Sequence, residues 1–244
     1  MPLVGGGVLL ACFAWWQRRA IAPLLPPRLF RNRSFSVANI VGLLFSLGIF
    51  GSVFILIQFL QVVQGFSPLR AGVMTMPWTL APLIVAPLTG LVTPRIGTRP
   101  VIITGLVLMT TGLLYIAAVM DPDVAYATFV PPLVLAGVGM GLVFAPLATA
   151  VLAGMPREDQ ATASGTNSTT REIGVALGIA VLTAVFLAAG GTLTPDGFTE
   201  AAIPAVRLGG LVLAVATLSA FALPGRDWVY RPPPSGPRAG RGAR

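Results

Sequence analysis

Long apolar runs separated by short polar connections dominate this chain. A helix that crosses the hydrocarbon core of a bilayer needs about 20 consecutive, predominantly apolar residues. Because backbone groups in lipid must form hydrogen bonds within their own segment, each run of that length predicts one transmembrane helix. Six runs qualify, at approximately 37–63, 71–92, 101–120, 126–154, 165–190 and 202–223.

A shorter apolar run precedes these six, at residues 3–16. It corresponds to about 21 Å of helix, which is too short to span a bilayer. Trp15, Trp16, Arg18 and Arg19 follow it, as in an interfacial belt with a cytoplasmic anchor, whereas a secretory signal carries its charge first. We therefore expect a truncated transmembrane helix at 1–16 and a basic cytoplasmic linker at 17–36, in a chain that is a fragment or has a misplaced start.

The composition agrees with this pattern. Hydrophobic residues make up 55% of the 244 residues and charged residues 10%, and the mean hydropathy is +0.84. Because soluble domains are about a quarter charged, these values predict an all-α membrane protein. Residues 225–244 hold Pro232, Pro233 and Pro234 among glycines and arginines, which predicts a disordered basic cytoplasmic tail.

Arginine placement predicts the orientation. All sixteen basic residues are arginines, and they gather in alternate connections, as the positive-inside rule requires of cytoplasmic segments. Only Arg70 and Arg207 fall on the other side. The C-terminus is therefore expected in the cytoplasm of a multi-pass plasma-membrane protein, and no basic patch interleaved with aromatic residues indicates nucleic-acid binding. The cytoplasmic group comprises Arg18, Arg19, Arg28, Arg31, Arg33, Arg95, Arg99, Arg157, Arg171, Arg226, Arg231, Arg238, Arg241 and Arg244.

The residues needed for most membrane enzyme chemistry are scarce. Cys12 is the only cysteine and histidine is absent, so no disulfide, His/Cys metal cluster or His-based triad can form. We expect no catalytic activity, no cofactor and no metal. Only Arg171 and Glu172 come near membrane depth, about one turn inside the run 165–190, as interfacial anchors or as gate charges that contact an inner loop.

Uncharged side chains in the runs could line a solute cavity. A cavity of aromatic and methionine side chains with few polar groups suits bulky hydrophobic or cationic solutes. Each candidate could also serve in packing. The candidates are Ser46, Ser52, Gln58, Gln61, Trp78, Met140 and Phe144.

Prolines and glycines in the second, fourth and fifth runs predict bent and closely packed helices. An interior proline removes a helical hydrogen bond and bends the axis, as gating in alternating access requires. Glycines spaced four apart let neighbouring helices approach closely. The prolines are Pro77, Pro82, Pro87, Pro131, Pro132 and Pro146, and the glycines are Gly137, Gly139, Gly141, Gly174 and Gly178.

Four segments resemble the major facilitator superfamily, in its multidrug-efflux branch with fourteen membrane helices. They are QVVQGFSPLRAGVMTMP at 61–77, GLVTPRIGTR at 90–99, AGVGMGLVFAP at 136–146 and TREIGVALGIA at 170–180. The resemblance implies that 37–224 forms the complete six-helix C-terminal domain, built from two inverted three-helix repeats. It also implies that the first and fourth spans line a central cavity, the second and fifth form its lateral walls, and the third and sixth are outer supports.

The inner-loop motif of that family matches Gly90, Arg95, Gly97 and Arg99, but Pro94 stands where the family has an acidic residue. The resemblance therefore implies a gate loop, in which Pro94 removes the acidic side chain of the family's charge relay. It further implies protons as the coupling ion, with a missing N-terminal half as partner.

Two functional interpretations remain open. One is the C-terminal half of a proton-coupled multidrug or small-molecule efflux transporter. The alternative is a truncated, transport-inactive or purely structural membrane remnant.

Overall fold

The computed structural model describes residue 15 and residues 27–225, and the regular structure within these ranges is helical. Most of the expected truncated helix, part of the linker and nearly all of the tail lie outside the described residues. Short 3-10 helices η1 (Pro27–Arg31) and η2 (Tyr126–Phe129) accompany the longer elements. The α-helices are α2 (Arg33–Val62), α3 (Pro68–Met74), α4 (Met76–Ile96), α5 (Thr98–Val119), α6 (Val130–Leu152), α7 (Arg157–Ala188) and α8 (Pro195–Ala220).

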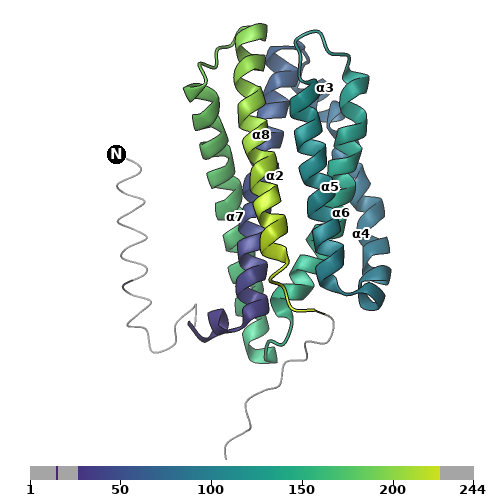
Figure 1. Cartoon of the computed structure of the whole chain (residues 1–244), viewed down its shortest axis with the longest axis vertical. Coiled ribbons are helices and arrows are strands. Elements are labelled where there is room, and N and C mark those ends of the chain that lie inside the picture. The colour runs from purple at the N-terminus through teal and green to yellow at the C-terminus, as the bar shows by residue number, and fades with distance from the viewer. Residues whose placement is uncertain (1–14, 16–26, 226–244) are drawn as a thin grey trace, which may run out of the picture.

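Six helical segments among the described residues are long and apolar enough to cross a membrane. They are α2, α4, α5, α6 with η2, α7 and α8, and they match the six apolar runs in order. Successive spans run in opposite directions along the long axis of the bundle (Figure 1). The prediction of an all-α membrane fold is therefore confirmed.

The bundle consists of two three-helix halves that exchange partners. α2, the first helix of one half, packs against α7 and α8 of the other. Correspondingly α6, the first helix of the second half, packs against α4 and α5. Two related three-helix units produce this reciprocal packing, although the sequence shows no clear internal repeat.

Burial divides the helices into central and peripheral ones. In the most apolar stretch of each helix, 61% of residues are buried in α2, against 11% in α4 and 22% in α7. α5 and α8 pack against each other and against the two first helices. α4 and α7 therefore form the flanks of the bundle, as Figure 1 also shows.

Three helices begin four or more residues earlier than the apolar runs predict. α2 starts at Arg33, four residues before position 37, because the Asn32 side chain caps it by accepting a hydrogen bond from the Phe35 N–H at 3.2 Å. α7 and α8 start at Arg157 and Pro195, eight and seven residues early. Hydropathy marks only the segment that lipid surrounds, whereas capping determines where the helix begins.

The second apolar run is not one bent helix. It breaks at Thr75 into α3 and α4, so Pro77 lies in the first turn of α4. A proline there removes no helical hydrogen bond, and the prediction that Pro77 bends a helix interior is wrong. Pro131 and Pro132 likewise sit in the first turn of α6. The prolines inside helices are Pro82, Pro87 and Pro94 in α4, Pro146 in α6, and Pro204 in α8, which the sequence analysis overlooked.

Glycines permit the closest helix contacts. A Cβ added at Gly51 in α2 would lie 2.6 Å from the carbonyl oxygen of Gly178 in α7. One added at Gly105 in α5 would lie 2.7 Å from the carbonyl oxygen of Gly139 in α6. Since real Cβ atoms do not approach so closely, these helices could not pack this way with larger residues.

Candidate functional site

A polar cluster joins α2 and α7 about a third of the way along the bundle. In α7, Asn167 donates a hydrogen bond from Nδ2 to Oδ1 of Asn39 in α2, at 3.3 Å, and both side chains are buried. Asn39 in turn donates to the carbonyl of Phe35 at 2.8 Å. Because an unpaired amide inside a membrane helix bundle is costly, the pair fixes α2 against α7 at this level.

Arg171 lies one helical turn beyond Asn167, on nearly the same side of α7. A Cβ placed at Gly42 would lie 3.4 Å from its Cγ, so the aliphatic part of Arg171 packs directly against α2 at this glycine. The guanidinium carbon stands 4.1 Å from the centroid of the Phe144 ring in α6. Arg171 thus bridges three helices, packed on α2 and stacked on an aromatic face from α6.

The depth of Arg171 differs from the expected one turn inside the helix. It follows the first residue of α7 by fourteen positions. Its neighbour Gly42 is nine residues from the start of α2, about 14 Å along the axis. Phe144 is eight residues from the end of α6, about 12 Å. Arg171 therefore lies further from the start of its helix than the expected one turn, because the polar residues before it are also helical, and its position relative to the membrane interface stays a prediction.

The guanidinium has no anionic partner in the part of the chain that the structure describes. The ion pair found there joins Arg28 and Asp159 instead. The Nε–H of Arg171 is buried and donates to no acceptor among the described residues. Glu172 is exposed, lies about 100° further round α7, and is not paired with Arg171.

The exposed surface of α7 has two chemically different sides. Ser164, Ser168 and Glu172 follow one another at spacings of four, on the side toward Arg171. Positions nine residues apart lie half a turn round a helix, so the opposite side carries large apolar residues. These are Ile173, Leu177 and Val181, each exposed by 39% or more.

The predicted cavity residues are not all on one surface. Ser46 and Ser52 are buried in helix contacts: Ser46 lies against Gly174 of α7, and Ser52 donates to the carbonyl of Gly48 at 2.7 Å. Gln58 and Gln61 are half-buried near the C-terminal end of α2. The hydroxyl of Ser46 is enclosed without a hydrogen-bond partner among residues 27–225.

The remaining cavity candidates differ in exposure. Trp78 of α4 is buried and meets the Phe50 ring of α2 edge-on, with centroids 6.2 Å apart. Met140 is half-buried against the core, while Phe144 is 40% exposed. We call Asn39, Asn167, Arg171 and Phe144 the inner polar cluster, and the surface around it the α2–α6–α7 face.

The motif residues 90–99 comprise the last two turns of α4, the connecting Gly97 and the first residues of α5. Gly97 ends α4 with a φ of 100°, a conformation that glycine adopts readily. Gly90 and Gly97 line a hollow of about 360 Å³ that also includes Pro94, Pro146 and Thr149. Arg95 is exposed, and Arg99 stacks 5.7 Å from the Phe221 ring, without an acidic partner within the described ranges.

The sequence analysis missed a polar junction at the same end. Asp159, in the first turn of α7, pairs with Arg28 at 2.8 Å and is only 11% exposed. Asn32 and Ser34 donate to the carbonyls of Ala153 and Ala150, at 3.1 and 2.8 Å. Acidic residues following Pro156 were the available signal, since carboxylates favour a helix N-terminus.

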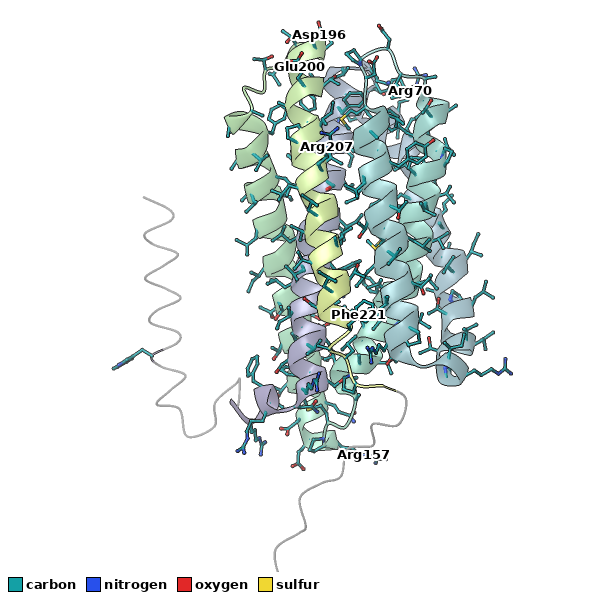
Figure 2. The ribbon with its side chains drawn as sticks, in the orientation of Figure 1. Arg70, Arg157, Asp196, Glu200, Arg207 and Phe221 are labelled. Carbon is teal, nitrogen blue, oxygen red and sulfur yellow. The ribbon has the colours of Figure 1, made fainter. Side chains whose placement is uncertain are left out.

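The two ends of the bundle differ in charge. Arg157 lies at the end where α2 and α7 begin, whereas Arg70, Asp196 and Glu200 lie at the other (Figure 2). Asp196 and Glu200 belong to the first turns of α8 and not to a connecting loop. Arg207 is exposed further along α8, on the same side as Leu211 and Leu218.

Comparison with known proteins adds the following. Residues 3–179 match the model of the Major Facilitator Superfamily. Multidrug resistance protein Stp of Mycobacterium tuberculosis (strain ATCC 25618 / H37Rv) is 34% identical over 80% of this chain and 36% of its own length. Multidrug transporter protein MdtP of Bacillus subtilis (strain 168) is 31% identical over 74% of this chain and 33% of its own.

A third relative carries a more specific name. The Tetracenomycin C resistance and export protein of Streptomyces glaucescens is 28% identical over 84% of this chain and 38% of its own length. The chain therefore spans little more than a third of the curated relatives it matches.

Proposed function

Because the chain belongs to the major facilitator superfamily, we propose that it forms the C-terminal half of an exporter of small hydrophobic solutes. The names of its relatives, which speak of multidrug resistance and of antibiotic export, support this proposal. The six membrane-spanning helices also agree with a half-transporter. In this proposal the protein lies in the plasma membrane, and its arginine-rich end faces the cytoplasm.

The observation that carries the proposal is the α2–α6–α7 face. Among the described residues it combines an exposed aromatic ring, Phe144, with a polar group well inside the bundle, Arg171. Solute sites in membrane transporters commonly combine apolar and aromatic surface with a few polar groups near mid-depth. A face that met only lipid would gain nothing from an arginine there.

Proton coupling is the finer part of the proposal. A coupled transporter needs a titratable group in its pathway. Glu172 is the carboxylate furthest from a helix end in the described helices, fifteen residues from the start of α7. The remaining proton-carrying groups would then belong to an N-terminal half that acts as partner.

The test is solute movement in proteoliposomes. Vesicles containing this polypeptide with a separately produced N-terminal half of a related transporter should move an uncharged hydrophobic dye when a pH gradient is imposed. Vesicles with either polypeptide alone serve as controls and should show only passive leak. Dye movement that does not depend on the second polypeptide or on the gradient would contradict the proposal, and so would the absence of movement for every solute tried.

The competing interpretation is a transport-inactive or purely structural remnant. It predicts that no combination of halves or solutes gives movement above leak. A counterflow assay with a panel of solutes distinguishes the two interpretations, because counterflow needs a working site but no coupling ion.

A further inference from the structure

The charge on the α2–α6–α7 face restricts which solutes it can hold. Placing a cation at the centre of a membrane helix costs roughly 2.5–3.5 kcal/mol on insertion scales, so such a group commonly has a partner. Arg171 has none among residues 27–225 except the ring of Phe144, and its Nε–H is unpaired. Water, a bound ligand and groups of the proposed N-terminal half remain as partners for the guanidinium.

The surroundings hold the guanidinium in one place. Gly42 leaves space for its stem, the Asn39–Asn167 hydrogen bond fixes the two helices beside it, and the Phe144 ring covers one side of its plane. A planar guanidinium held in this way offers two parallel N–H donors to a carboxylate. Little side-chain entropy would be lost on binding, because the side chain is already confined.

The ligand chemistry follows from these two partners. The guanidinium favours an oxyanion, and the exposed part of the Phe144 ring favours an aromatic body. Resting on the function proposed above, we propose that this face binds solutes that join an aromatic ring system to a carboxylate or phenolate. Bulky cations, which the sequence pattern also allowed, would be repelled by Arg171 at this point. Glu172 carries the opposite charge and interacts electrostatically with Arg171, but it lies about 100° round the helix and forms no ion pair with the guanidinium, which leaves the N–H groups available to a ligand.

Three probes that carry substituents of different charge on the same ring system provide the test. Anthracene-9-carboxylate, anthracene-9-methanol and anthracene-9-methylammonium share one ring system. Their equilibrium binding is measured with the whole chain in phosphatidylcholine nanodiscs, and binding to empty nanodiscs is subtracted. The carboxylate should bind about tenfold more tightly than the alcohol, a typical value for one charge-assisted hydrogen-bonded pair, and the ammonium should bind most weakly.

Substitutions at Arg171 then test whether this residue causes the preference for the carboxylate. Arg171→Gln should weaken carboxylate binding to the level of the alcohol, which itself should change little. Arg171→Lys keeps the charge without the planar pair of donors, so it should retain only part of the preference. Arg207→Gln is the matched control, since Arg207 is an exposed arginine on the apolar side of α8, and it should leave all three affinities unchanged.

The experiment tests the carboxylate preference with more than one protein variant. Equal binding of the three probes to the unsubstituted chain would overturn the inference, and so would an undiminished carboxylate preference in Arg171→Gln. If Arg171→Gln does not fold, the ranking by the unsubstituted chain and by Arg171→Lys still decides. Because only binding is measured, a carboxylate preference without any transport would refute the exporter proposal alone. Transport with no charge preference would refute only this inference.

Discussion

Two helix contacts occupy corresponding places in the two halves of the bundle and differ in chemistry. α2 packs against α7, and α6 packs against α4, each a first helix against the second helix of the other half. The α2–α7 contact combines paired asparagines, Arg171 and two glycines pressed onto backbone. The α6–α4 contact combines glycines with an apolar helix that three interior prolines interrupt.

The difference indicates that the two flanking helices, α7 and α4, are held with different firmness. On one side, hydrogen bonding and backbone contact hold α7 to α2 and place a charge about 12–14 Å from the ends of α2 and α6. On the other, Pro82 leaves the carbonyl of Trp78 without its helical partner, and that oxygen lies 2.6 Å from a Cβ placed at Gly137. We therefore expect α7 to be the firmly held flank and α4 the deformable one.

The largest expected effect is from overfilling the α2–α7 contact. A Cβ at Gly178 would meet the backbone of Leu47, which cannot give way as a side chain could. Gly178→Leu should therefore lower the free energy of unfolding by about 3 kcal/mol or more. The thermal unfolding midpoint of the detergent-solubilised chain measures this loss.

Gly165→Leu is the matched control for that substitution. It lies in the same helix with nothing within 4 Å of an added Cβ, so it should leave the midpoint unchanged or slightly raised. Equal midpoints for the two variants would show that α7 is not held closely against α2.

The same change in the other contact should cost less. Gly137→Leu would press on the Trp78 backbone and Ala81 in α4, but α4 is peripheral and interrupted by prolines, so it can move aside. We expect a loss of about 1–2 kcal/mol in the same unfolding measurement. A loss as large as that of Gly178→Leu would remove the distinction between the two flanks.

Breaking the asparagine pair should have a moderate effect that the partner substitution reverses. Asn167→Leu leaves the Asn39 amide without this partner, at a cost of about 1 kcal/mol, since interhelical hydrogen bonds in membranes average near 0.6 kcal/mol. Asn39→Leu together with Asn167→Leu should recover most of the loss. Strictly additive losses in the double variant would argue against a coupled pair.

The smallest effect is expected from restoring a helical hydrogen bond in α4. Pro82→Ala supplies an N–H for the Trp78 carbonyl, so amide hydrogen exchange around residue 82 should slow. The free energy of unfolding should change by no more than about 1 kcal/mol. Unchanged exchange would mean that the proline does not loosen α4.

Much of the fold could be predicted from the sequence, because the length of an apolar run is set by the thickness of the bilayer. The six spans and their order are correct for that reason. The break at Thr75 was missed because a proline early in a run fits a bend and a helix start equally well. The reciprocal packing of the halves depends on contacts between segments far apart in the chain, which run lengths do not encode.

The candidate site was predicted less well. Phe144 and Arg171 were both singled out, but nothing in the linear pattern brings them together. Asn39 and Asn167 were overlooked, although one buried amide in each of two packed helices was a usable signal for a polar contact. The depth of Arg171 was misjudged because the polar residues before it resemble a loop, whereas they form the first turns of α7.

The most direct test of the account is which side of α7 water reaches. In a Cys12→Ser background, Ser168→Cys and Ile173→Cys place one thiol on each exposed side of the same helix, about 7.5 Å apart along its axis. Membranes opened to both faces are treated with a membrane-impermeant maleimide. The account predicts that Ser168→Cys is labelled and Ile173→Cys is not, because the first faces a watered solute path and the second faces lipid. Equal labelling of the two, or labelling of Ile173→Cys alone, would contradict it.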